Sequence, residues 1–302
     1  MAKQQDSLDT NPSLIGKIVA IMPASLPAKI YNALSIIPAF KKIMNQIILS
    51  RIPTQIDIAE GTIMLDQTDV AVSGSLAIGA FEKTEIDLFR RCLKPGMTVV
   101  DIGANIGYYT VIAAKNIGSN GKLFAYEPEN RNYSFLEKNI GINKLTNVIP
   151  FKIGISDKKG TNKLYLDDDN KGRHSFVFNE DKSAISIETD TLDESLRRYG
   201  SPTIDIIKID IEGAEFLALQ GMKETIKRSP NLIIFSELYP KGMRKLGGDP
   251  RKYLENLVES GFSLSIIDGD SNKVTPISDI QEFVDYFPGG EAFRNIIASK
   301  IG

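Results

Sequence analysis

Residues 99–110 combine an acidic side chain, two glycines and the expected start of a helix. The segment reads Val-Val-Asp-Ile-Gly-Ala-Asn-Ile-Gly-Tyr-Tyr-Thr, with the acid at Asp101 and the glycines at Gly103 and Gly107. Glycines let the backbone turn sharply and let a ligand approach without meeting a Cβ atom. Glu127 ends the next expected strand, where a carboxylate can accept hydrogen bonds from both ribose hydroxyls of a nucleoside. The pattern predicts a nucleoside site.

The glycine spacing indicates which nucleoside. A dinucleotide site takes G-x-G-x-x-G, but Asn105 and Tyr108 stand at its second and third glycine positions, and the sequence has no phosphate loop of the G-x-x-x-x-G-K-[ST] type. An acidic residue such as Asp101 can instead face a cationic amino group. S-adenosylmethionine carries an ammonium, a ribose and an adenine but no phosphate, so it is the predicted cofactor. An NAD-dependent oxidoreductase is the weaker alternative.

A second acidic segment, residues 204–215, reads Ile-Asp-Ile-Ile-Lys-Ile-Asp-Ile-Glu-Gly-Ala-Glu. Glu215 falls in the first turn of an expected helix, where stabilisation of the helix dipole explains an acid. Asp210 follows a strand that is expected to lie beside the first one, so it should face the same crevice. Glu237 ends the next strand and adds a further carboxylate beside Asp210.

The elements that must position these residues alternate along the chain. Strands are expected at 98–102, 122–126, 147–153, 204–209, 232–235, 262–267 and 295–298, and helices at 82–93, 107–116, 130–139, 214–226 and 252–260. Strands that are apolar throughout indicate a parallel sheet covered by helices on both faces. Right-handed crossovers then give a doubly wound α/β fold. Residues 54–80, which contain Gly61, Gly74 and Gly79, are expected to form β-hairpins.

Residues 155–203 interrupt this alternation. Two alternating runs predict a β-hairpin inserted at about 158–190, and such an insertion can cover the carboxyl ends of the strands. Ile155, Ser156 and Asp157 precede it and are placed to border the adenine, with Asp157 able to accept from the adenine amino group. His174 lies in the hairpin loop, where a lone histidine is usually solvated, but its position over the site makes it a candidate base.

Several of these segments together resemble the FkbM family of S-adenosylmethionine-dependent methyltransferases. The matching pieces are residues 101–110, 127–128, 139–143, 191–193, 205–213 and 235–237, with 82–85 similar to the family's lead-in. The resemblance covers about residues 60–300. It implies a class I methyltransferase (Rossmann-like) fold of seven strands with the last strand antiparallel. It also implies O-methylation of a hydroxyl on a sugar, glycan or natural product.

Position and resemblance together assign roles to the candidate residues. The turn formed by Asp101, Gly103, Ala104, Asn105 and Gly107 would hold the methionine part of the cofactor, Glu127 the ribose, and Ser156 and Asp157 the adenine. Asp210 and Glu212 would face the methyl group and the acceptor. The base that removes the hydroxyl proton is expected to be Asp210, Glu237 or His174, in that order. The preferred prediction has no metal, and a divalent ion held by Asp210 and Glu237 is the alternative.

Composition limits the function classes. The 302 residues hold 36 Lys and Arg against 38 Asp and Glu, a net charge of −2, which disfavours a protein that coats nucleic acid. The amino-methylating Asn/Asp-Pro-Pro-aromatic motif does not occur in the sequence. Cys92 is the single cysteine and His174 the single histidine, so disulfides within the chain and cysteine- or histidine-rich metal sites are excluded. A reduced, cytoplasmic enzyme with a small-molecule or glycan acceptor is expected.

Residues 1–55 lie outside the resemblance and are predicted to form a helical N-terminal extension to a methyltransferase domain at 56–302. The apolar runs within 14–52 are shorter than the roughly 18 residues that a spanning helix needs. They favour amphipathic helices that pack on the main domain or on a partner subunit. A helix lying on a membrane surface, with basic residues at the headgroups, is the alternative. A noncatalytic partner subunit that docks through this extension also stays open.

Overall fold

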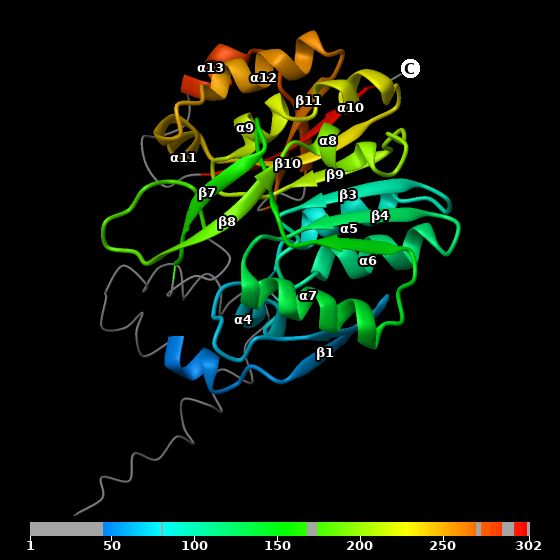
Figure 1. The fold of residues 1–302 in the computed structure, drawn as a ribbon, viewed down its shortest axis with the longest axis vertical. Coiled ribbons are helices and arrows are strands. Elements are labelled where there is room, and N and C mark those ends of the chain that lie inside the picture. Colours follow the sequence, from blue (N-terminus) through cyan, green and yellow to red (C-terminus); the bar gives the residue numbers. More distant parts are fainter. Residues whose placement is uncertain (1–44, 80, 168–173, 270–272, 286–292, 301–302) are drawn as a thin grey trace, which may run out of the picture.

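A computed structural model describes residues 45–79, 81–167, 174–269, 273–285 and 293–300 (Figure 1). Its centre is an eight-stranded sheet with the order β12-β11-β13-β10-β9-β3-β4-β5. The strands are β3 (Thr98–Ile102), β4 (Lys122–Tyr126), β5 (Val148–Phe151), β9 (Ile206–Ile209), β10 (Ile233–Leu238), β11 (Ser263–Asp268), β12 (Lys273–Pro276) and β13 (Arg294–Ser299).

The strand directions confirm the predicted class I methyltransferase fold. Strands β5, β4, β3, β9 and β10 run parallel to one another. The last strand, β13, lies between β10 and β11 and is antiparallel to both. The eighth strand, β12, pairs with the outer edge of β11 and was not predicted. Because the first strand, β3, sits between β4 and β9, the order reverses there, which is where ligands bind in such sheets.

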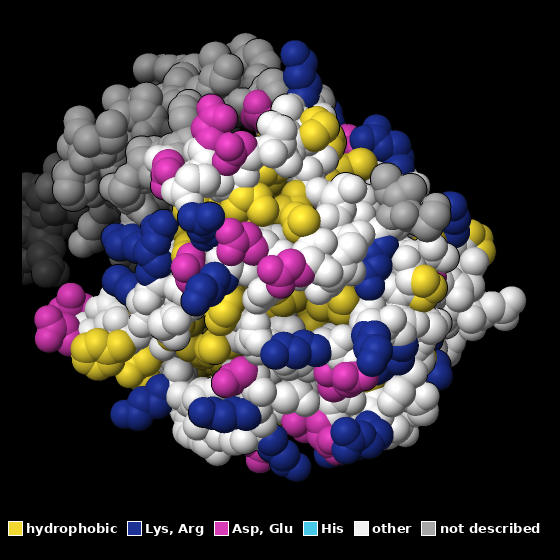
Figure 2. Space-filling model, turned by 90° about the horizontal axis from the view of Figure 1, so that it is seen from above, with side chains coloured by type: hydrophobic (Ala, Val, Ile, Leu, Met, Phe, Trp, Pro, Cys, Tyr) yellow, Lys and Arg dark blue, Asp and Glu magenta, His cyan; other side chains and the backbone are white. Residues whose placement is uncertain are grey.

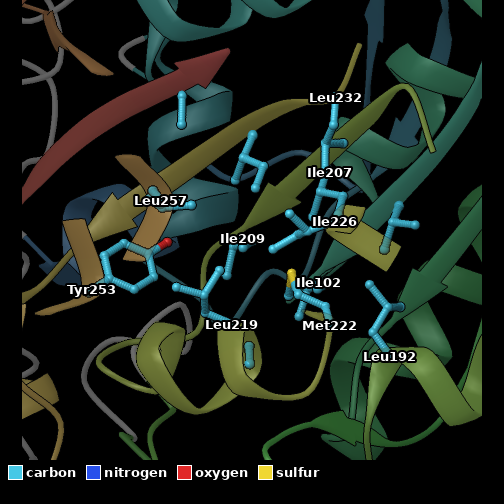
Figure 3. Packing of buried hydrophobic residues seen from close by; sticks show 14 of the residues in the cluster. Ile102, Leu192, Ile207, Ile209, Leu219, Met222, Ile226, Leu232, Tyr253 and Leu257 are labelled. Carbon is cyan, nitrogen blue, oxygen red and sulfur yellow. The ribbon is translucent and has the colours of Figure 1, made fainter. Parts of the chain in front are cut away.

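Helices cover both faces of the sheet, as the alternation predicts. One face carries α5 (Lys83–Cys92), α6 (Tyr108–Ile117) and α7 (Asn130–Ile142). The other carries α8 (Leu192–Arg197), α9 (Glu215–Gln220), α10 (Lys223–Arg228), α11 (Pro240–Lys245), α12 (Pro250–Glu259) and α13 (Ile280–Asp285). Figure 3 shows the second layer, where Ile207 and Ile209 of β9 point toward Leu219 and Ile226 of the helices. Neighbouring residues of one strand thus serve opposite layers, since Ile206 packs with the first.

Two sequence predictions are wrong in detail. The expected helix 214–226 is broken into α9 and α10, because Gly221 packs so closely on another loop that an added Cβ would lie 2.0 Å from the Ser156 carbonyl oxygen. Within 54–80, β1 (Gln55–Ile58) and β2 (Gly61–Met64) form the expected hairpin, but residues 72–77 form helix α4 (Val72–Ala77). The Asp69 carboxylate starts α4 by accepting the Ser73 N–H at 2.8 Å.

The N-terminal extension is described only from residue 45. Residues 45–49 are helical, and Ile52 is buried against Ile63 and Leu65 of the hairpin segment and Val72 of α4. The rest of the predicted helical stretch lies outside the described residues, so the division at residue 55 stays a prediction. None of the helices in the described ranges is both long and apolar enough to cross a bilayer.

The segment after β5 forms a small second sheet. It contains β6 (Gly154–Ile155), β7 (Gly160–Tyr165) and β8 (Ala184–Asp190), and β7 and β8 are antiparallel. The antiparallel pair β7 and β8 therefore lies within the range 158–190, where the sequence predicts an inserted hairpin. On the face seen in Figure 2, Lys and Arg side chains are interspersed with Asp and Glu side chains, in keeping with the near-zero net charge.

Candidate active site

Three neighbouring strands bring Gly103, Asp210 and Glu237 side by side. Ile102 of β3 pairs with Ile209 of β9, and Ile209 pairs with Ser236 of β10. The residues that follow these three on their strands therefore lie next to one another at the carboxyl edge of the sheet. The Asp210 N–H donates a 3.0 Å hydrogen bond to the Ile102 carbonyl, which continues the ladder. In sheets of this kind the ligand crevice lies beyond this edge, at the point where the strand order reverses.

The turn after β3 requires glycine. Gly103 has φ 83°, and an added Cβ would lie 1.9 Å from the Asp210 carbonyl oxygen. Gly107, the residue before α6, has φ 89°, and its added Cβ would lie 2.8 Å from Leu136 Cδ1. Both backbones adopt the left-handed region that favours glycine. The N–H groups of Gly103 and Ala104 both donate to the Tyr126 carbonyl at the end of β4, which pins the turn.

Glu127, at the end of β4, is bonded to that turn. Its Oε2 accepts the Asn105 N–H at 2.9 Å and its Oε1 accepts the Glu129 N–H at 2.9 Å. The side chain is buried, and burial raises the pKa of Glu127 to about 8. Each carboxylate oxygen has a further lone pair beyond the one used here. Glu127, the residue predicted to bind the ribose, is thus hydrogen-bonded directly to the glycine turn. The sequence alone did not predict this bond.

Asn139 of α7 connects the same turn to β2 through hydrogen bonds. Its Nδ2 donates to the Ile106 carbonyl at 2.7 Å, and its Oδ1 accepts the Met64 N–H at 2.6 Å. One turn later, Asn143 makes a matching pair of bonds with the N–H and carbonyl of Thr62. These two amides attach the β1–β2 hairpin to the turn.

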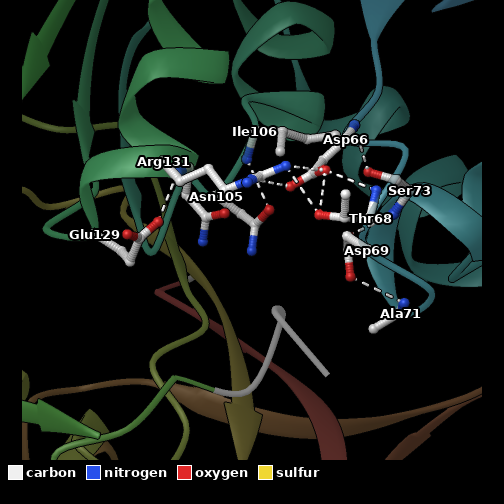
Figure 4. A network of polar contacts seen from close by, with 10 residues as sticks. Asp66, Thr68, Asp69, Ala71, Ser73, Asn105, Ile106, Glu129 and Arg131 are labelled. Atoms are coloured by element: carbon white, nitrogen blue, oxygen red, sulfur yellow. Dashed lines mark hydrogen bonds and ion pairs between the residues drawn. The ribbon is translucent and has the colours of Figure 1, made fainter. Parts of the chain in front are cut away.

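A charged network lies beside Asn105. Arg131 of α7 forms an ion pair with the buried Asp66, and its Nη2 lies 2.9 Å from the Thr68 hydroxyl oxygen. Figure 4 shows the Arg131 side chain lying beside Asn105 and reaching toward Asp66 and Thr68. Sequence reasoning missed this network, because the partners come from segments that only the fold brings together.

A buried lysine lies under the crevice. The Lys208 side chain is 2% exposed, and its Nζ lies 3.3 Å from Asp210 Oδ2 and 3.5 Å from Glu85 Oε1. The same ammonium lies 4.7 Å from the centre of the Tyr109 ring. Sequence reasoning also missed Lys208, although a lysine inside the apolar strand Ile206–Ile209 is a signal that could have found it.

Burial raises the pKa of two acids at this edge of the sheet, Glu237 and Glu82. Burial, followed by Asp210, Glu212 and Glu215, raises the pKa of Glu237 well above its usual value, and Glu237 Oε2 has no hydrogen-bond partner among the residues that the structure describes. Burial and the neighbouring Glu85 raise the pKa of Glu82 to about 8. Protonated Glu237 can donate a hydrogen bond, whereas a proton acceptor must be found elsewhere in the cluster.

Asp101 lies deeper than predicted. Its side chain is buried beneath the turn, and its Oδ2 accepts a 2.6 Å hydrogen bond from the Thr110 hydroxyl of α6. Burial raises the pKa of Asp101 to about 6. In this arrangement Asp101 connects β3 to the first turn of α6. The predicted contact between Asp101 and the amino group of the cofactor stays a prediction.

The candidate adenine residues border a cavity. Ser156 Oγ donates to Asp157 Oδ1 at 3.1 Å. Both residues line a cavity of about 320 Å³ between the inserted sheet and the helices. Its other lining residues are Lys158, Asn162, Lys163, Tyr165, Phe176, Phe178, Leu217 and Leu246. Ile155, in contrast, is buried in the core and is absent from this lining.

His174 is held by its own loop. Its Nδ1 accepts the Asp167 N–H at 3.0 Å, so the nitrogen that could take a proton is already used. The neighbouring Ser175 hydroxyl donates to the Glu212 carbonyl at 2.6 Å, which fastens the insertion to the segment after β9. Glu212 itself is buried with φ 49°, and Glu215 accepts the Gly213 N–H at 2.9 Å.

Three of the five described residues other than glycine that have left-handed backbone lie at this site, and the other two are Lys144 and Ser201. Glu82, Asn105 and Glu212 have φ values of 32°, 51° and 49°. Such conformations are strained by about 1–3 kcal/mol each, and they persist where the surroundings fix them, often at functional sites. Within the described parts of the chain, no group of three or more His, Cys, Asp and Glu side chains has an arrangement suited to a metal ion.

Residues 101–263, more than half of the chain, match the family model described as a methyltransferase FkbM domain. The chain belongs to the FkbM methyltransferase family. Its cofactor is accordingly S-adenosylmethionine. The matched residues contain the glycine turn, Glu127, the inserted sheet, and the crevice acids Asp210 and Glu237.

Curated relatives of this FkbM methyltransferase are identical to it at about a quarter of the positions over roughly half of its length. Methyltransferase sdnD of Sordaria araneosa is 26% identical over 177 residues, 48% of this chain and 68% of the relative. Hexuronic acid methyltransferase AglP of Haloferax volcanii is 27% identical over 166 residues, 55% of this chain and 63% of the relative. 2-O-methyltransferase NoeI of Sinorhizobium fredii is 27% identical over 152 residues, 45% and 61% respectively. The chain spans somewhat under two thirds of the last two relatives.

Solved structures are more distant in sequence. Methyltransferase FkbM from Methylobacillus flagellatus is 14% identical, with a TM-score of 0.41 over 84% of this chain and 57% of that one. SMU.1697c, a methyltransferase-like protein from Streptococcus mutans in complex with SAH, is 10% identical, with a TM-score of 0.42 over 72% and 97%.

Proposed function

We propose that this FkbM methyltransferase transfers the methyl group of S-adenosylmethionine to a hydroxyl oxygen of a sugar, glycan or natural product. The observation that carries the proposal is the placement of Asp210 beside Gly103 and Glu237 at the carboxyl edge of three parallel strands. The names of two relatives, a hexuronic acid methyltransferase and a 2-O-methyltransferase, favour oxygen on a sugar as the acceptor.

The charge of the site fits a cationic, phosphate-free nucleoside. Four carboxyl groups act on the ammonium of Lys208: Glu82, Glu85, Asp101 and Asp210. Glu237 in turn interacts with Asp210 and Glu82. Those carboxyl groups that are ionised attract the sulfonium and ammonium charges of the cofactor. The buried, unpartnered Glu237 Oε2 is a further group that a bound ligand can satisfy.

The turn and the β4 acid are proposed to bind the cofactor. The segment containing Gly103, Ala104, Asn105 and Gly107 would hold its methionine part, with Asp101 as the support beneath. Glu127 would accept the ribose hydroxyls through its remaining lone pairs, while its bonds to Asn105 and Glu129 keep it in place. Ser156 and Asp157 would meet the adenine at the edge of the cavity.

Asp210 is the proposed proton acceptor. When bound, the cofactor supplies a methyl group on an already activated sulfur, so alignment of the acceptor oxygen provides much of the rate. The Asp210 side chain is 31% exposed at the crevice, whereas Glu237 is buried and favours its protonated form. Asp210 would take the hydroxyl proton, and Glu237 would donate a hydrogen bond in the same crevice. His174 ranks last, because its Nδ1 already accepts a backbone N–H.

The proposal is tested by incubating the purified full chain with methyl-labelled S-adenosylmethionine and fractionated glycan and metabolite extracts. A sugar or natural-product fraction should gain one methyl group on oxygen, and Asp210→Asn should abolish most of the transfer. Binding of the cofactor with no transfer to any fraction would support a noncatalytic partner subunit instead. Binding of NADH in preference to S-adenosylmethionine would support the oxidoreductase alternative. Labelling of nucleic acid would contradict the proposed acceptor class.

A further inference from the structure

The burial of Lys208 needs an explanation. It is flanked on the neighbouring strands by Asp101 of β3 and Phe235 of β10, in a strand otherwise made of isoleucines. Removing an ammonium from water costs several kcal/mol unless opposite charges compensate it. A hydrophobic residue would fill this place in the sheet at no such cost. A lysine here is therefore expected to serve its neighbours.

The partners of Lys208 come from three different elements. Asp210 lies two positions along the same strand path and so projects from the same face of the sheet. Glu85 projects from α5, and the Tyr109 ring from α6 lies 4.7 Å from the ammonium. The ammonium thus has contacts from the residue after β9, from α5 and from α6. The fixed ammonium can in turn fix a carboxylate that reaches into the crevice.

We propose that Lys208 is a positioning residue, whose buried ammonium, anchored on Glu85, holds the Asp210 carboxylate in the orientation that the reaction uses. The assignment of Asp210 to the reaction rests on the proposed function. The exposed fractions of the two side chains support different roles, because Lys208 is 2% exposed whereas its partner Asp210 is 31% exposed. Lys208 is therefore shielded from a ligand in the crevice, whereas Asp210 is accessible to one.

Lys208 keeps its charge throughout the working pH range. Four acids face it: Asp210, which follows β9; Glu85 of α5; Glu82, the N-cap residue of α5; and Asp101 of β3. Together they raise the pKa of Lys208 well above its usual value despite its burial. A permanent charge suits an anchor, whereas a proton carrier would need a pKa closer to neutrality.

The test uses a charge-balanced double variant. Lys208→Met alone leaves the buried Glu85 carboxylate without its ion-pair partner and risks unfolding. Lys208→Met is therefore combined with Glu85→Gln. The matched control is Arg90→Met with Glu60→Gln, which removes another ion pair of α5, at 2.8 Å, away from the crevice. Both double variants should keep the native circular dichroism and a cooperative thermal transition.

Measurements of kcat distinguish a positioning role of Lys208 from an effect on folding. With an acceptor in hand, the Lys208→Met/Glu85→Gln variant should lose about 100-fold in kcat, the effect of a misplaced reacting group, while KM for S-adenosylmethionine stays within threefold. The control pair should keep wild-type kcat, and Lys208→Arg should recover part of the lost rate. Wild-type kcat in the folded Lys208 double variant would overturn the inference.

Crystal structures decide the same point without a reaction. The Asp210 carboxylate should leave its wild-type position or become multiply placed in the Lys208 double variant, and it should stay in place in the control. An unchanged Asp210 in both would overturn the positioning role. A wild-type protein that transfers no methyl group would contradict the proposed function alone, because the position of Asp210 is still read from the structures.

Discussion

The Tyr109 hydroxyl donates a 2.8 Å hydrogen bond to Glu82 Oε2, and this bond joins the first turn of α6 to the residue before α5. Glu82 occupies the left-handed region at φ 32°, so its backbone is strained. The bond aims its carboxyl at the cluster that contains Glu85, Lys208 and Asp210. The lead-in to the first strand is thereby part of the candidate active site.

Tyr109→Phe should therefore destabilise the protein and weaken the site. Loss of the bond to a carboxylate should cost about 1.5–3 kcal/mol in the free energy of unfolding, measured with urea. It should also raise the pKa of Glu82 above about 8, because the Tyr109 hydroxyl lowers that pKa. Tyr133→Phe on α7 is the control and should change stability by less than about 0.5 kcal/mol. Equal effects of the two substitutions would contradict the role given to Tyr109.

Gly103→Ala should abolish cofactor binding. The added methyl group would lie 1.9 Å from the Asp210 carbonyl oxygen, and φ 83° is unfavourable for alanine. We expect a loss of about 2 kcal/mol or more in the free energy of unfolding. Gly141→Ala is the control, because nothing lies within 4 Å of its added Cβ, and in helix α7 it should stabilise by up to about 1 kcal/mol. Thermal unfolding of both variants, with and without cofactor, measures the difference.

The stability of the ligand-free protein should fall as the pH rises from about 5 to about 8. Glu127 and Glu82 have pKa values of about 8, Glu215 about 7 and Asp101 about 6, all raised mainly by burial. In this window the native state holds protons that the unfolded chain has released, so rising pH favours unfolding. Urea titrations at several pH values measure the slope. Glu127→Gln should flatten it, and a slope of the opposite sign would contradict the buried-acid description.

Substitutions of the two candidate bases should have different effects. Asp210→Asn should lower kcat by about 100-fold or more, as expected for loss of a general base. His174→Ala should keep most of the wild-type kcat, because its Nδ1 serves the Asp167 N–H of its own loop. Steady-state kinetics with the identified acceptor measures both. A large loss in His174→Ala together with a small one in Asp210→Asn would exchange their roles.

Local patterns predicted the frame of the site. The order strand, glycine turn, helix and acid placed Gly103, Gly107 and Glu127 in one crevice because each step depends on neighbours in the sequence. The family resemblance predicted that the last strand is antiparallel, and the antiparallel pairing of β13 with β10 and β11 confirms this. Short-range periodicity was sufficient for these elements.

Contacts between distant segments could not be predicted in the same way. The ion pairs of Lys208 with Glu85 and of Arg131 with Asp66 depend on how helices pack on the sheet. The break at Gly221 depends on the approach of the Ser156 loop. The hydrogen bond from Thr110 to the buried Asp101 was likewise not predicted, and the role of Asp101 in binding the cofactor stays a prediction. Each outcome is a tertiary effect that overrides local propensity.

Calorimetric titration of the full chain with S-adenosylmethionine tests the central claim, that the crevice beyond β3 and β4 binds this nucleoside by its ribose. The wild-type protein should bind, and Glu127→Ala should weaken binding by at least about tenfold through loss of hydrogen bonds to a carboxylate. Glu137→Ala, at an exposed position of α7, is the control and should bind as the wild type does. Equal affinity of the folded Glu127→Ala variant and the wild type, or no binding by the wild type, would contradict the account.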